Sequence, residues 1–147
     1  MNRKIFKKSV LFLLAGLVIP SFLTSCLDVG ENDDTPDFGV YSTLPEEGAT
    51  DVTLDSAVVI TFETDVDPDT VTTSTFVVRD ETGTAVSGDV YAEGVVADFR
   101  ADGYLEAETT YTVTLDESIA DIYGRTLGDF LGSDYTFSFT TGVQTSE

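Results

Sequence analysis

The sequence predicts an all-β protein, an antiparallel β-sandwich of about seven short strands, and three observations support this class. Short runs of β-branched and aromatic residues alternate with Gly, Pro, Asp and Thr clusters from residue 38 to residue 142. Several runs alternate apolar and polar residues with the period of two that a half-buried strand requires. Turn residues separate the runs at short intervals, which favours strands joined by tight connections over parallel strands joined by helices.

The strands are expected at residues 39–43, 57–63, 76–80, 86–92, 96–100, 110–115 and 135–140. In three of them the apolar residues share one face, formed by Val58, Ile60 and Phe62, by Tyr111, Val113 and Leu115, and by Tyr135, Phe137 and Phe139. These faces are the predicted core of the sandwich.

The connections contain residues with turn chemistry. Asp67 can accept hydrogen bonds from free amides at the start of a helical turn, and Pro68 suits its first position. Gly83 can take the positive φ of a tight hairpin link. In the turn at residues 121–124, Ile122 is expected to close one end of the core.

The first 25 residues have the order of a secretory signal peptide. A basic start with Arg3, Lys4, Lys7 and Lys8 precedes an apolar run at residues 10–19. This run is shorter than the roughly 20 residues of a membrane-spanning helix, and Pro20 follows it. Residues 1–25 are therefore predicted to be removed after export.

Residues 23–26, Leu-Thr-Ser-Cys, resemble the lipobox at which a bacterial lipoprotein receives diacylglycerol on its cysteine. Cleavage is expected between Ser25 and Cys26, and Cys26 is the only cysteine in the sequence. The resemblance implies a protein lipid-anchored to a membrane of the cell envelope, on the extracytoplasmic side. Two acyl chains suffice for stable anchoring, because each buried methylene contributes about 0.8 kcal/mol.

The chain after the predicted cleavage is strongly acidic. Three cations, Arg79, Arg100 and Arg125, stand against 27 acidic residues, which gives a side-chain charge of −24. This charge argues against nucleic acid as a partner and against electrostatic contact with anionic lipids. Residues 26–37 are expected to form a lipidated N-terminus and a flexible acidic linker, because they are charged and contain few apolar residues.

Ordered motifs in both halves of the chain resemble the SbsA-type, or S-layer-type, bacterial Ig-like domain. The first half contains Pro45-x-x-Gly48, Val59-Ile60-Thr61-Phe62 and Val66-Asp67-Pro68-Asp69-Thr70-Val71; the second contains Leu105-x5-Tyr111-Thr112-Val113, Ile119-x-Asp121-x-x-Gly124-x-x-Leu127 and Phe137-Ser138-Phe139-Thr140-Thr141-Gly142. The resemblance implies one Ig-like domain at residues 38–142, with a short tail at 143–147. Domains of this family commonly act as spacers, adhesion modules or appendages of cell-surface proteins, without shared catalytic residues.

Leu105, Thr109 and Tyr111 have the spacing of the tyrosine corner of other β-sandwiches. In that motif the tyrosine hydroxyl forms a hydrogen bond with nearby backbone and holds a crossover in place. Ala107 stands where proline is often found, so a less stiff corner is expected.

The composition argues against most catalytic and metal sites. The chain has no histidine, and all its lysines precede residue 26, so Ser-His and Ser-Lys catalysis lack a base. Zinc, haem and iron–sulfur centres lack their usual ligands. A pair of carboxylates could still serve a small hydrolase, which is a remote alternative.

Calcium binding is the more specific alternative to a purely structural role. Asp65, Asp67 and Asp69 begin like an oxygen-ligand loop, but Thr70 and Phe76 stand where an EF-hand needs glycine and glutamate. Capping of a turn by Asp67 is the competing interpretation. A second acidic group, Asp116 and Glu117 with Asp121, is open to the same two interpretations.

Four tyrosines near strand ends or turns are candidates for binding carbohydrate or a partner, with core packing or the plugging of a turn as the default role of each: Tyr41, Tyr91, Tyr104 and Tyr123. The sequence thus predicts a non-enzymatic envelope protein that presents one Ig-like module for structural, adhesive or docking interactions. Its expected contacts are the membrane, through lipid on Cys26, and an envelope or surface partner.

Overall fold

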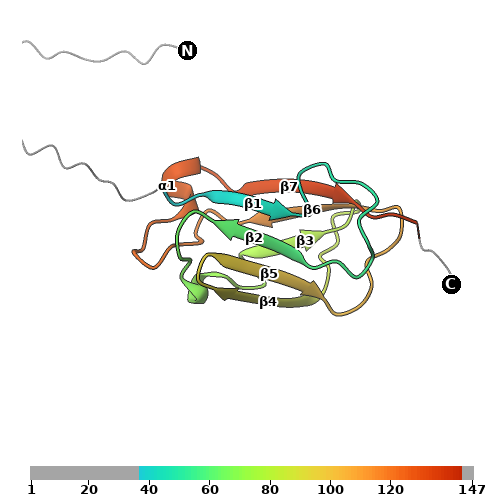
Figure 1. The fold of residues 1–147 in the computed structure, drawn as a ribbon, viewed down its shortest axis with the longest axis horizontal. Coiled ribbons are helices and arrows are strands. Elements are labelled where there is room, and N and C mark those ends of the chain that lie inside the picture. The colour runs from blue at the N-terminus through green and yellow to red at the C-terminus, as the bar shows by residue number, and fades with distance from the viewer. Residues whose placement is uncertain (1–36, 144–147) are drawn as a thin grey trace, which may run out of the picture. The chain divides into compact units, whose positions relative to one another are not determined.

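Seven strands form two antiparallel sheets in the computed structural model, which describes residues 37–143 (Figure 1). The strands are β1 (Val40–Leu44), β2 (Val58–Phe62), β3 (Phe76–Arg79), β4 (Gly88–Glu93), β5 (Val96–Ala101), β6 (Thr110–Leu115) and β7 (Tyr135–Thr140). One sheet has the order β1-β2-β5-β4 and the other the order β3-β6-β7. The predicted all-β sandwich is confirmed, and the chain before residue 37, with Ser25 and Cys26, lies outside the described residues.

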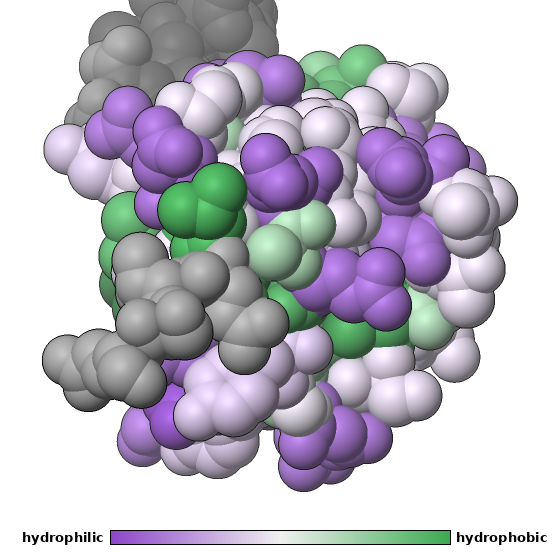
Figure 2. Space-filling model, turned by 90° about the vertical axis from the view of Figure 1, so that its right-hand side faces the viewer, coloured by the Kyte–Doolittle hydropathy of each residue, from purple (hydrophilic) through white to green (hydrophobic). Residues whose placement is uncertain are grey.

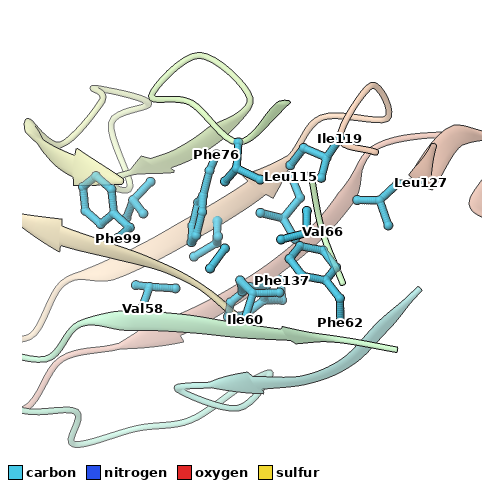
Figure 3. Close-up of a cluster of buried hydrophobic side chains, with 14 of the residues drawn as sticks. Val58, Ile60, Phe62, Val66, Phe76, Phe99, Leu115, Ile119, Leu127 and Phe137 are labelled. Atoms are coloured by element: carbon cyan, nitrogen blue, oxygen red, sulfur yellow. The ribbon is translucent and has the colours of Figure 1, made fainter. Parts of the chain in front are cut away.

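The core lies between the two sheets, where alternate residues of each strand meet. Val58, Ile60 and Phe62 on β2 face Leu115 on β6 and Phe137 on β7, and all five are nearly or fully buried (Figure 3). Complete burial of such a side chain contributes about 1.5–3 kcal/mol to stability. The period-two pattern of the sequence therefore selects the buried face directly.

Two of the sheet edges are covered by short segments of the same chain. Residues 48–52 run along β7, with Gly48 N donating to Ser138 O at 2.8 Å and Val52 bridging to Thr141 in parallel. Val86 N donates to Val78 O at 2.8 Å, so residues 84–86 cover β3. This pairing explains why β4 begins at Gly88 rather than at residue 86, where the sequence predicted its start.

The sandwich has two distinct ends. At one end, here called the entry end, β1 begins, and α1 (Leu127–Leu131), the 3-10 turn η1 (Pro68–Thr70) and the β4–β5 turn lie at the same end (Figure 1). At the far end lie the connections at residues 45–57, 80–87 and 102–109, together with residues 141–143 (Figure 1). Within residues 37–143, no helix is long and apolar enough to span a membrane.

The entry end differs from the sequence prediction at two points. Ile122 was expected to close the core, but 55% of its surface is exposed. Ile119 and Leu127 are fully buried there, and the carboxylate of Asp121 is buried beside them because Arg125 pairs with it. The sequence also gave no prediction of α1, whose first turn is capped by Thr126 and which Gly132 ends with φ 72°.

Candidate functional site

Two adjoining cavities open at the far end of the sandwich. The first, of about 610 Å³, is lined by residues 51–55, Tyr104, Gly142 and Val143, and we call it the tyrosine cavity. The second, of about 490 Å³, is lined mainly by apolar residues and is called the leucine cavity; its walls include Leu44, Pro45, Ala49, Val52 and Val59. Figure 2 looks onto this end, where hydrophobic residues lie among hydrophilic ones.

Val52 and Thr53 line both cavities and so form a shared wall. Backbone hydrogen bonds hold this wall in place: Val52 N donates to Thr140 O at 3.2 Å, and Gly142 N donates to Val52 O at 2.9 Å. Leu105 N donates to Leu54 O at 2.7 Å, which joins the segment to the loop that carries Tyr104. The cavities are therefore built from three chain segments that the backbone ties together.

The far end exposes large apolar and aromatic side chains. The exposed fractions are 81% for Tyr104, 64% for Leu44 and 63% for Val143. Each of these residues lines one of the two cavities. Such exposed apolar groups beside hollows are typical of surfaces that bind a ligand or a protein partner.

Carboxylates surround the apolar groups of the far end. Asp51 and Asp55 line the tyrosine cavity and Glu46 lines the leucine cavity, while neither lining includes a lysine or an arginine. Asp51 has a positive φ of 57°, a conformation that aspartate tolerates better than most residues. The cavities thus offer negative charge next to apolar surface, a combination that suits a ligand with a cationic and an apolar part.

All four tyrosines singled out in the sequence are exposed, so core packing is not their role. Of these four tyrosines, Tyr104 is the one that lines either the tyrosine cavity or the leucine cavity. The Tyr91 hydroxyl donates to Glu93 at 3.0 Å, and this hydrogen bond and the negative charge of Glu93 raise the pKa of Tyr91. The Tyr123 ring lies 5.6 Å from the guanidinium carbon of Arg125, and Tyr41 lies on the edge strand β1.

Asp67 takes the capping position at the start of η1. Its Oδ1 accepts a hydrogen bond from Asp69 N at 3.1 Å, with Pro68 at the first helical position. Within the described part of the chain, no group of three or more His, Cys, Asp or Glu side chains could hold a metal ion. Asp65, Asp67 and Asp69 are thus not brought together into such a group there, and calcium binding stays an alternative for experiment to test.

The second acidic group is also divided among local hydrogen bonds. Asp116 Oδ1 accepts from Ser118 N at 2.9 Å, and the hydrogen bonds from the Ser118 side chain and backbone lower the pKa of Asp116. Glu117 is exposed, and Asp121 pairs with Arg125. The carboxylates of Asp116 and Asp121 thus hold the β6–β7 connection through local hydrogen bonds.

The Tyr111 hydroxyl accepts a hydrogen bond from Glu106 N at 2.8 Å, five residues upstream. Thr109 N donates to Thr141 Oγ1 at 3.0 Å, and Thr141 Oγ1 donates to Glu106 O at 2.6 Å. Leu105 is 5% exposed and packs in the core. This hydrogen-bond network joins the β5–β6 connection to the end of β7, beside the tyrosine cavity. The role of Thr141 in the network was not predicted from the sequence.

The cavities themselves could not be predicted from the sequence. Leu44, residues 51–55 and Val143 were not singled out, since nothing in their spacing indicates that they meet. Tyr104 was found because it is an aromatic residue in a polar connection.

The sequence profile of the family described as bacterial Ig-like domain matches residues 33–141. Among solved structures, the chain is similar to CopC from Methylosinus trichosporium OB3b, with 14% identity and a TM-score of 0.59 over 76% of this chain and 99% of CopC. It is also similar to domains 1–6 of the surface layer protein SbsC, with 20% identity and a TM-score of 0.55 over 76% of this chain and 14% of that one.

An L,D-transpeptidase from Mycobacterium smegmatis is similar as well, with 18% identity and a TM-score of 0.50 over 73% of this chain and 41% of the transpeptidase. The chain therefore spans less than half of the transpeptidase and a small part of SbsC. At these identities the similarity shows the fold. No curated protein matches the chain.

Proposed function

The chain belongs to the bacterial Ig-like domain family, and we propose that it is a non-enzymatic, lipid-anchored envelope protein of the SbsA type that docks a surface partner. In this proposal Cys26 carries the lipid and the far end of the sandwich carries the docking surface. The module then acts as a spacer with a binding end, on the extracytoplasmic side of a bacterial membrane.

The proposal rests on one observation: the chain enters the sandwich at one end, and the two cavities open at the opposite end. The described chain enters the domain where β1 begins, at the end that contains α1 (Figure 1). The connections and the C-terminal end of β1 that line the two cavities lie at the other end. A lipid on Cys26 would hold the entry end within the reach of residues 27–37, at most about 36–40 Å when extended. The far end would then be free to meet a partner.

A docking role also agrees with the chemistry of the far end. The lining of the cavities consists of carboxylates, hydroxyls, one tyrosine and aliphatic groups. Without histidine in the sequence, these groups lack the usual general base for nucleophilic catalysis at neutral pH. Exposed tyrosines such as Tyr104 are instead among the residues from which binding surfaces draw most of their energy.

The anchor is tested by replacing Cys26 with serine. The wild-type protein is expected in the membrane fraction, with an N-terminal peptide whose mass includes acyl chains. Cys26→Ser is expected to leave the protein unprocessed or released from the membrane. Unchanged processing and membrane retention of the variant would contradict the anchor.

The docking end is tested by a photo-crosslinking amino acid placed at Tyr104 in intact cells. The matched control places the same amino acid at Tyr123, which is 70% exposed at the entry end. A discrete crosslinked product is expected from position 104 and not from position 123. Products from position 123 alone, or equally from both, would show that the far end is not the docking surface.

A further inference from the structure

We propose that the two cavities bind one extended segment of a partner protein, with a lysine or arginine in the tyrosine cavity and an apolar residue in the leucine cavity. The inference rests on the proposed docking function and specifies the chemistry of the partner. It follows from the charge, the lining and the shared wall of the two cavities.

Charge complementarity identifies the basic residue. Asp51 and Asp55 line the tyrosine cavity with the exposed ring of Tyr104, and no cation is among the residues that line it. A guanidinium or ammonium group is attracted by the face of an aromatic ring and by carboxylates at the same time. An anionic ligand would meet two carboxylates in this cavity. Arg100 lines a neighbouring hollow that shares Asp55 with the tyrosine cavity, but its Nε already pairs with Asp98 at 2.8 Å.

The leucine cavity selects an apolar side chain. Leu44 and Val59 are direct partners across the β1–β2 ladder, so their side chains lie side by side on the outer face of that sheet. Pro45, Ala49 and Val52 complete this surface. The volume of about 490 Å³ is in the range of small-ligand sites, and the hollow is open to solvent, so it can accept an apolar side chain from a partner.

The shared wall places the two cavities side by side, so that one extended segment can reach both. Val52 and Thr53 separate the two cavities, and the hydrogen bonds of Val52 to Thr140 and Gly142 hold this wall in place. A chain that fills both cavities must cross the wall, with its basic and apolar residues a few positions apart. Because the wall is already ordered, little conformational entropy is lost on its side when the segment binds.

The charge of the protein argues that the segment comes from another protein rather than from a second copy. After the predicted cleavage the chain has three arginines against 27 acidic residues. Within residues 37–143, Arg125 lies in the buried pair with Asp121, and Arg100 pairs with Asp98 at 2.8 Å. The third, Arg79, donates from Nη1 to Gly83 O at 3.0 Å. Two copies would repel each other and offer few cations to the tyrosine cavity.

The test selects binders for the full-length protein, extracted in detergent, from a library of random short peptides. The selected peptides are expected to combine a lysine or arginine with an apolar residue a few positions away. Their affinity is expected to fall at least about tenfold in Asp51→Asn/Asp55→Asn and in Leu44→Ser. Asparagine preserves the shape of aspartate and tolerates the positive φ of position 51, so the double variant should keep its fold.

The matched control is Glu63→Gln/Glu93→Gln, which removes two exposed charges at the entry end. It is expected to keep the affinity of the wild-type protein, and all variants are compared by their unfolding midpoints. Failure to enrich any peptide, enrichment of acidic peptides, or an equal loss in the control would overturn the inference. If the Tyr104 crosslink still forms in cells, the proposed docking function stands although this partner chemistry is wrong.

A carbohydrate ligand is the other outcome to be distinguished. Chitohexaose and cellohexaose are titrated against the wild-type protein, Tyr104→Ala and Asp51→Asn/Asp55→Asn. No binding of either sugar is expected. Sugar binding that Tyr104→Ala abolishes and the double variant retains would assign the cavity to neutral glycans and overturn the peptide proposal.

Discussion

Asp121 and Arg125 form a buried ion pair in the β6–β7 connection, with Arg125 Nε and Nη2 2.7 and 2.6 Å from Asp121 Oδ2. Asp121 Oδ1 accepts further hydrogen bonds from the backbone N–H groups of Tyr123 and Arg125, both at 2.9 Å. Asp121 also bridges to Val66, which joins the connection to the β2–β3 loop. One buried carboxylate thus organises the entry end of the sandwich.

Asp121→Ala is expected to lower the free energy of unfolding by about 3 kcal/mol, because removal of one partner leaves the other charge uncompensated. The estimate lies at the low end of the usual range since the Arg125 side chain is 24% exposed. Urea unfolding measures the effect. The control is Asp98→Ala, which breaks a pair whose arginine is 75% exposed and should cost less than about 1 kcal/mol. Equal losses in the two variants would contradict a special role of the buried pair.

The stability that Asp121 provides should depend on pH. Burial raises the pKa of Asp121, but hydrogen bonds from Arg125 and Tyr123 outweigh it, so the folded pKa lies below 3.8. A carboxylate with a lowered folded pKa stabilises the protein above its unfolded pKa, near pH 4, and this stabilisation is lost as pH falls through the folded value. The difference in unfolding free energy between wild type and Asp121→Asn should therefore be constant above about pH 5 and shrink below about pH 4. A difference that grows on acidification would be the wrong sign for this linkage.

Gly88→Ala is expected to destabilise the domain by at least about 1–3 kcal/mol, the usual cost of inserting an atom into packed structure. A Cβ at position 88 would lie 2.3 Å from Arg100 O and 2.7 Å from Phe99 Cζ, where β4 pairs with β5. Gly103→Ala is the control, because nothing lies within 4 Å of its added Cβ. Thermal unfolding of both variants measures the difference, and a Gly88→Ala midpoint equal to that of the control would contradict the close approach.

The sandwich could be predicted from the sequence because its strands bury alternate residues. β6 and β7 lie where the period-two pattern placed them, and the turn at Gly83 has the expected positive φ of 84°. The pattern did not indicate α1, whose five residues form little more than one turn and owe their start to Thr126 and their end to Gly132. Asp121 is buried in place of Ile122 because it pairs with Arg125. The hydrophobic periodicity of a sequence does not indicate an ion pair of this kind.

The candidate site was less predictable than the fold because it joins segments that are distant in sequence. Residues 51–55, Tyr104 and Val143 meet through parallel pairing along β7 and one hydrogen bond from Leu105 N to Leu54 O. Hydrophobic periodicity describes which face of a strand is buried and says nothing about connections at its ends. Tyr104 alone was open to prediction, as an aromatic residue in a polar loop.

Tyr111→Phe is expected to cost about 1 kcal/mol of unfolding free energy, because Glu106 N loses its hydrogen-bond acceptor in a partly buried position. The aromatic ring, which stacks on Phe139 at 5.6 Å between centroids, is unchanged by this substitution. Tyr41→Phe is the control, since Tyr41 is 74% exposed. Urea unfolding of both variants measures the effect, and a loss in Tyr41→Phe as large as in Tyr111→Phe would show that the corner hydrogen bond does not stabilise the fold.

Calcium at millimolar concentration is expected to leave the thermal unfolding midpoint unchanged, because Asp67 serves as a helix cap. Its Oδ1 accepts from Asp69 N, and within residues 37–143 no three acidic side chains converge on a metal-sized site. A ligand that binds the folded state at concentrations well above its Kd would raise the midpoint. Asp67→Ala should lower the unfolding free energy by about 0.5–2 kcal/mol through loss of the cap, with or without calcium. A midpoint that rises with calcium in the wild type and not in Asp67→Ala would instead show that the Asp65–Asp69 loop binds the ion.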